Sequence, residues 1–163
     1  MSGMIKAIDK FNKILGILLA VLLIIMSVVI FYQVFSRFVL QESLRWSEEL
    51  ARYLMIWSVF IGSALAIRKL DLISVDALKE LLSDRAKSIL NIIVYIVCIG
   101  FLCVLIWYGI DIVGNVTRQT SPAMNISMAW PYSAIPVGSI FMMINCLAVI
   151  LNNILKLKGG VEE

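Results

Sequence analysis

Four long hydrophobic blocks constrain the fold of this chain more than any other feature of its sequence. Three of them, residues 14–36, 88–110 and 132–155, contain no charged side chain. The remaining block, residues 50–67, is the second in chain order and contains a single charge, Arg52, close to its start. As α-helices, the three uncharged blocks are long enough to cross the roughly 30 Å hydrocarbon core of a bilayer. The pattern therefore predicts an all-α membrane protein built as a bundle of four transmembrane helices.

Lysine and arginine residues flank these blocks unequally. Ten of the 14 cations lie before the first block, between the second and third blocks, or after the fourth. The other four lie near the opposite ends of the blocks: Arg37, Arg45, Arg52 and Arg118. Because cytoplasmic loops carry the excess of Lys and Arg, both termini and the middle connection are predicted to be cytoplasmic.

Composition excludes several classes of function. With 163 residues and 61% hydrophobic content, residues 1–163 are expected to form a single membrane domain. The net charge of +3 follows from the topology and does not indicate binding to nucleic acid. There is no histidine, and the three cysteines lie inside the blocks without the spacing of a metal site. We therefore expect no catalytic residue, no cofactor and no metal.

The connection between the second and third blocks is predicted to be helical. From Val75 onward apolar residues fall on one helical face, charged and polar residues occupy the rest, and Ser74 is placed to cap the start. This amphipathic cytoplasmic helix either lies on the membrane surface or packs under the bundle, and the sequence leaves both arrangements open.

Two features inside the blocks concern helix packing. Ser58, Gly62 and Ala66 recur every four residues, a spacing of small side chains that lets another helix come close. That helix belongs either to this chain or to a different subunit. Asn145, deep in the last block, needs a hydrogen-bond partner inside the membrane, and a neighbouring helix is expected rather than a substrate.

Five charged residues gather around the start of the second block, and we call them the charged ridge: Glu42, Arg45, Glu48, Glu49 and Arg52. If the helix begins near Glu42, all five fall within about one third of its circumference. They form either an internal ladder of ion pairs, which contributes little to stability, or a docking surface for a partner protein.

Short motifs follow one another in a definite order over about residues 10–155. They are Trp46-Ser47-Glu48-Glu49, then Arg52, Trp57, Phe60, Gly62, Arg68, Val75-Asp76, Tyr108-Gly109, Ser121-Pro122-Ala123, Met128, Tyr132 and Pro136-Val137-Gly138. In this order, and combined with four spans, they resemble the small membrane subunit of tripartite ATP-independent periplasmic (TRAP) transporters.

The resemblance implies a non-catalytic role in a bacterial cytoplasmic (inner) membrane. In that family a large membrane subunit, separate or fused, holds the substrate and sodium sites, and a soluble periplasmic substrate-binding protein delivers the substrate. The small subunit would brace the large one within the membrane lipid and help dock the binding protein for sodium-coupled uptake of an organic acid, with sialic acid as a candidate.

The alternatives are a four-helix small exporter and a free-standing membrane scaffold protein. An exporter is expected to carry a carboxylate within a span, and none of the four blocks has an acidic residue near its middle. The sequence therefore favours the subunit over the exporter.

Overall fold

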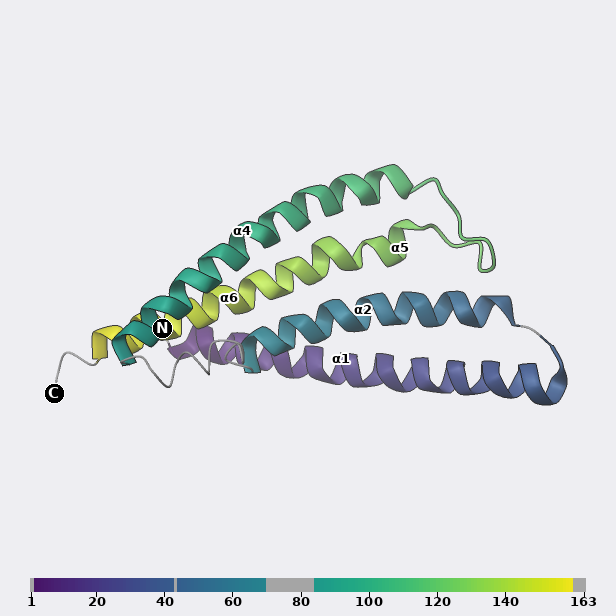
Figure 1. Cartoon of the computed structure of the whole chain (residues 1–163), viewed down its shortest axis with the longest axis horizontal. Helices are drawn as coiled ribbons and strands as arrows, with labels where there is room; N and C mark the ends of the chain where they lie inside the picture. The colour runs from purple at the N-terminus through teal and green to yellow at the C-terminus, as the bar shows by residue number, and fades with distance from the viewer. Residues whose placement is uncertain (1, 43, 70–83, 160–163) are drawn as a thin grey trace.

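Helices account for almost all of the computed structural model, which describes residues 2–42, 44–69 and 84–159 (Figure 1). The elements in chain order are α1 (Ser2–Phe35), a π-helical segment (Ser36–Leu40), α2 (Arg45–Lys69), α4 (Asp84–Val116), α5 (Ala129–Tyr132) and α6 (Ala134–Gly159). Four stretches are long and apolar enough to cross a membrane: Ala7–Leu40, Arg45–Arg68, Ser88–Val116 and Ala129–Leu155. The predicted all-α class and the four transmembrane helices are confirmed.

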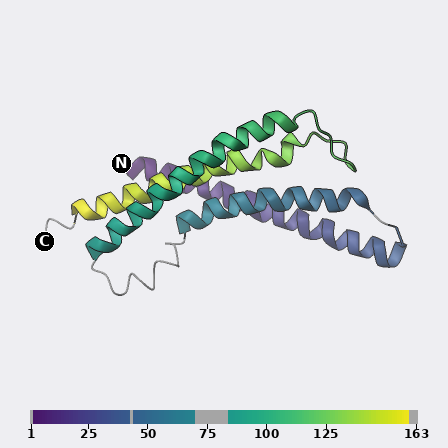
Figure 2. The same cartoon turned by 45° about the horizontal axis from the view of Figure 1, so that its top comes forward.

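The four long helices pack in a row rather than as a closed square. α1 packs on α2, α2 on α6, and α6 on α4, whereas α1 reaches α6 only over a short stretch (Figures 1 and 2). Burial is greater for an inner helix of the row than for the outer helix α1. In the most apolar 18 residues of each span, 44% are buried in the last span, on α6, but only 6% in the first span, on α1. α1 therefore leaves a broad apolar face uncovered by the rest of the described chain.

The two ends of the molecule differ. α1 begins and α6 ends at one of them, which we call the termini end (Figure 1). The turn that follows Leu40 and the α4–α5 connection, residues 117–128, lie at the other, which we call the loop end. The amphipathic helix predicted from Val75 falls mostly on residues 70–83, which lie outside the described residues.

Two glycines lie where a neighbouring helix comes too close for a side chain. A Cβ atom added to Gly138 on α6 would lie 2.5 Å from the Cβ atom of Phe60 on α2. One added to Gly109 on α4 would lie 3.0 Å from the Cδ atom of Pro136 on α6. The α2–α6 and α4–α6 contacts therefore depend on the absence of a side chain at these two positions.

The small-residue stripe of α2 lies inside the chain at two of its three positions. Ser58 is buried, and a Cβ atom at Gly62 would meet the Leu19 side chain of α1 at 3.7 Å, which is ordinary van der Waals contact. Ala66 is half-buried. At Gly62, at least, the neighbouring helix belongs to this chain.

A buried amide pair joins three helices. Asn145 on α6 is 0% exposed, and its Nδ2 donates to Asn12 Oδ1 on α1 at 2.9 Å and to the Ala64 carbonyl on α2 at 2.7 Å. Asn12 Nδ2 donates in return to Asn145 Oδ1 at 2.7 Å. Next to this pair, Phe11 and Phe141 pack edge to face with ring centroids 5.3 Å apart. These contacts hold α1 to α6 where the two helices otherwise touch little.

Replacing Gly138 by alanine is expected to destabilise the helix row. The added methyl group would overlap Phe60, so the α2–α6 contact must open, at a cost of about 1–2 kcal/mol. The free energy of unfolding, measured by detergent denaturation of the purified chain, reports this loss. Gly100→Ala is the matched control, because a Cβ atom there meets nothing within 4 Å and alanine favours a helix. Equal stability of the two variants would show that the α2–α6 approach is looser than described.

Candidate docking site at the loop end

A pocket of about 620 Å³ opens at the loop end between the start of α2, the α4–α5 connection and α5. Four of the five charged-ridge residues line it: Arg45, Glu48, Glu49 and Arg52. Facing them are apolar and aromatic groups of the later segments, among them Pro122, Met128 and Tyr132. We call this space the loop-end pocket. It is where the charged ridge meets the second half of the chain.

Glu49 is directed into the protein and is only 9% exposed. Its Oε2 accepts hydrogen bonds from the backbone N–H groups of Ala123 and Met124, both at 3.0 Å. Its Oε1 accepts one from the Tyr53 hydroxyl. Hydrogen bonds to a charged acceptor are stronger than neutral ones, so this carboxylate binds the start of α2 firmly to the α4–α5 connection.

The α4–α5 connection is folded so that these two N–H groups point at Glu49. Ser121 N donates to Ile126 O at 2.8 Å, and Asn125 N donates to Ser121 O at 3.1 Å, which closes a tight loop after Pro122. Asn125 has φ of 53°, a left-handed conformation that asparagine tolerates better than most residues. An antiparallel bridge between Thr120 and Ser127 closes the base of the loop. The connection therefore presents a fixed shape to α2.

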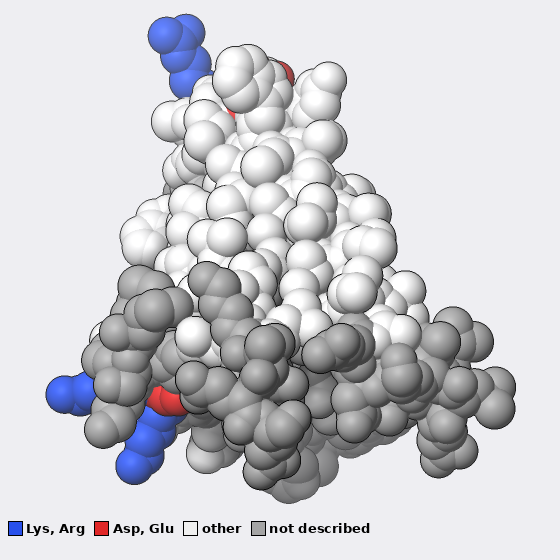
Figure 3. All heavy atoms as spheres, turned by 90° about the vertical axis from the view of Figure 1, so that its left-hand side faces the viewer, with Lys and Arg blue, Asp and Glu red and all other residues white. Residues whose placement is uncertain are grey.

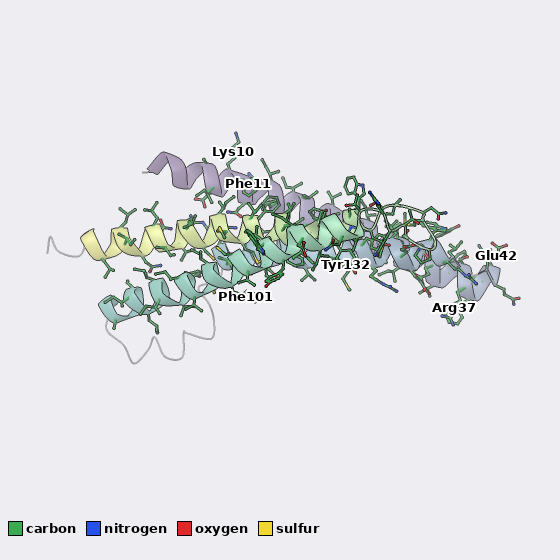
Figure 4. The ribbon with its side chains drawn as sticks, turned by 90° about the horizontal axis from the view of Figure 1, so that it is seen from above. Lys10, Phe11, Arg37, Glu42, Phe101 and Tyr132 are labelled. Carbon is green, nitrogen blue, oxygen red and sulfur yellow. The ribbon has the colours of Figure 1, made fainter. Side chains whose placement is uncertain are left out.

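The position of Glu42 corrects one expectation. α2 begins at Arg45, so the assumption that the helix starts near Glu42 is wrong. Gln41 adopts a left-handed conformation that ends the preceding segment, and Glu42 N then donates back to Ser36 O at 3.2 Å. Glu42 is thereby held at the tip of the α1–α2 hairpin (Figure 4), and it does not line the loop-end pocket as the other four charged-ridge residues do.

Arg45, Glu48 and Arg52 are exposed, and they do not form the ladder of ion pairs. Among the residues whose side chains the structure describes, the one salt bridge joins Arg68 to Asp9, at the termini end. Glu48 instead accepts a hydrogen bond from Gln33 Nε2 on α1 at 3.1 Å. The two arginines therefore line the loop-end pocket without a carboxylate bound to them.

The sequence did not identify two parts of this arrangement. Tyr53 binds Glu49 from four residues further along the same helix, a spacing that could have suggested the contact. Tyr53 Oη also lies 3.3 Å from Met128 Sδ. The second missed part is the pair of backbone donors at Ala123 and Met124, which no side-chain pattern reveals.

Known proteins are similar to this chain along most of its length. The family model described as tripartite ATP-independent periplasmic transporters, DctQ component, matches residues 26–156. The sialic acid TRAP transporter small permease protein SiaQ of Vibrio cholerae serotype O1 is 29% identical over 162 residues, which cover 97% of this chain and 89% of that protein.

Two longer permeases are similar to this chain over a small part of their own length. The sialic acid TRAP transporter permease protein SiaT of Haemophilus influenzae is 29% identical over 138 residues, which are 85% of this chain but 22% of that protein. The isethionate TRAP transporter permease protein DctMQ of Oleidesulfovibrio alaskensis is 30% identical over 104 residues, or 63% of this chain and 16% of that protein.

Proposed function

This chain belongs to the DctQ component family of the tripartite ATP-independent periplasmic transporters, and we propose that it braces a large permease subunit and helps dock a substrate-binding protein. The family comprises transporter components and not enzymes, and the chain is a small TRAP permease subunit. Its four apolar helices make it a multi-pass membrane protein. The resemblance drawn from the sequence motifs is confirmed.

The bracing role is supported by the relatives and by the uncovered face of α1. In SiaT and DctMQ, the segment similar to this chain occupies 22% and 16% of the length, so a much larger remainder is joined to it. In this chain only 6% of the most apolar window of the first span is buried within the molecule. Such a face suits contact with a larger membrane subunit as well as with lipid.

The docking role rests on one observation, the loop-end pocket. Arg45 and Arg52 line it without ion pairs within the described chain, and Glu49 fixes the segment opposite them. A rigid surface with charges free to pair suits recognition of a soluble protein, because charge complementarity steers encounter and selects the partner. The arginine and lysine distribution supports a periplasmic position for this end and cytoplasmic positions for both termini in the inner membrane.

The proposed substrate is an organic acid, taken up with sodium through the large subunit. Two of the relatives carry sialic acid in their names and one carries isethionate. All of these are organic anions, and we favour sialic acid because it recurs. The small subunit contributes no substrate site in this proposal, since its spans have no acidic residue near the middle.

Reversing the charge of Arg45 is expected to slow uptake in the complete reconstituted system. An Arg45→Glu variant would repel an acidic group of the binding protein, and we expect sodium-driven sialic acid uptake to fall about fivefold. Because Arg45 is exposed and makes no ion pair in the described chain, the melting temperature of the membrane complex should stay unchanged.

Arg118→Glu is the matched control. Arg118 is exposed at the same end but does not line the loop-end pocket, so its reversal should leave uptake near the unmodified rate. Omitting this chain should abolish uptake. Equal rates for both reversal variants would reject the docking role, and uptake without the chain would reject the bracing role.

A further inference from the structure

A second pocket, of about 600 Å³, lies between α1 and α2 at the termini end. Charged side chains line it nearest the end of the molecule: Asp9 and Lys13 from α1 and Arg68 from α2. Further toward the middle of the spans it is lined by Gly16, Ile17 and Leu65. We call it the termini-end pocket. It is polar where a membrane-spanning bundle meets the headgroups and apolar where it meets the hydrocarbon.

The charges of the termini-end pocket do not cancel. Arg68 donates through Nε and Nη2 to Asp9 Oδ1, at 3.0 Å and 2.8 Å, so these two charges compensate each other. Lys13 is exposed, and in the described parts of the chain it takes part in no ion pair. Figure 3, which looks onto this end, shows basic side chains and an acidic one together on one side. The pocket therefore keeps one excess positive charge.

The apolar part of the pocket is open rather than filled. A Cβ atom added to Gly16 would meet nothing within 4 Å, and the adjacent Ile17 side chain is exposed. An open apolar surface one turn from a lysine without an ion pair fits an amphiphile, since an inorganic anion would leave the exposed Ile17 side chain without a partner.

We propose that the termini-end pocket binds an anionic phospholipid, with its phosphodiester beside Lys13 and an acyl chain along Gly16 and Ile17. The single excess cation selects a headgroup of net negative charge over a zwitterionic one, because cations near a membrane surface attract anionic lipid. α1 and α2 pack directly on one another, and the bound lipid occupies the pocket that this contact leaves open at the termini end. This site is independent of the proposed docking role.

Lipid binding by the full-length chain can be measured by native mass spectrometry during titration with dioleoylphosphatidylglycerol. We expect Lys13→Gln to weaken this binding about fivefold. Lys10→Gln removes the same charge from the same helix, but Lys10 does not line the pocket and points away from the other helices (Figure 4). The Lys10 variant should bind like the unmodified chain.

A second variant and two other probes distinguish lipid binding in the pocket from electrostatic attraction alone. Gly16→Leu leaves every charge in place but puts a side chain into the open space, and it should also weaken phosphatidylglycerol binding. Dioleoylphosphatidylcholine should bind more weakly than phosphatidylglycerol, and inorganic phosphate should not compete. Equal losses for Lys13→Gln and Lys10→Gln, an unaffected Gly16→Leu variant, equal binding of the two lipids, or competition by phosphate would each overturn the proposal.

Discussion

Replacing Glu49 by alanine is expected to release the α4–α5 connection from α2. The Ala123 and Met124 N–H groups both donate to Glu49 Oε2, and the Tyr53 hydroxyl donates to Oε1, so the variant leaves three donors without their acceptor. A hydrogen bond to a charged group is strong enough that its loss should speed amide exchange at Ala123 and Met124 about tenfold or more. Hydrogen exchange of the purified chain, read on peptides that cover residues 121–126, measures this release.

Glu48→Ala is the matched control for this prediction. Glu48 is the neighbouring carboxylate, lies on the same pocket, and binds only Gln33 in the described chain. Its loss should leave exchange at residues 121–126 unchanged. Glu49→Gln keeps one oxygen acceptor and should give an intermediate rate. If Glu49→Ala and Glu48→Ala exchange alike, the carboxylate does not hold the connection in place.

The release has a consequence for the proposed docking role. Pro122 and Ala123 form one wall of the loop-end pocket, and Arg45 and Arg52 lie across from them. A mobile wall would require the binding protein to order it on contact, which lowers affinity. Glu49 therefore belongs to the docking surface through the segment it positions, whereas Arg45 and Arg52 are the residues free to touch a partner.

The four spans could be predicted from sequence because the hydrocarbon core imposes a simple rule. A long run without charges must form a helix there, and residues 14–36, 88–110 and 132–155 meet that rule without exception. The helices are longer than the blocks: α1 begins at Ser2 and α4 continues to Val116. This rule does not apply to the polar residues at the ends of a span, so it did not locate the start of α2 at Arg45.

The contacts that place the helices in a row could not be predicted in the same way. Glu49 and Ala123 are 74 positions apart, and Asn12 and Asn145 are 133 positions apart. Nothing in a single sequence pairs residues at such distances. Asn145 could be singled out because an amide inside a span needs a partner, whereas Asn12 lies just before the first block, where this rule does not apply.

The packing glycines show a similar limit. The spacing of Ser58, Gly62 and Ala66 indicates a close helix contact, but among the glycines the tightest contacts occur at Gly138 and Gly109. Each of these is an isolated glycine opposite a bulky side chain on another helix, Phe60 and Pro136 respectively. A periodic pattern on one helix is visible in its sequence, whereas a fit between two helices is not.

Replacing Asn145 by leucine is expected to destabilise the junction of α1, α2 and α6. Leucine keeps the branched shape and the number of heavy atoms but leaves the Asn12 amide buried without its reciprocal partner and removes the bond to the Ala64 carbonyl, at a cost of about 2–3 kcal/mol. The free energy of unfolding in mixed micelles measures this loss. Asn153→Leu is the control, because Asn153 Nδ2 donates only to the Val149 carbonyl of its own helix and should matter less.

The double variant Asn12→Leu/Asn145→Leu should lose less stability than the sum of the single variants, since it leaves no unpaired amide, and the coupling should reach about 1 kcal/mol. Strictly additive losses would mean that the two amides do not bind each other, and α1 would then be held to α6 by apolar packing such as the Phe11–Phe141 contact.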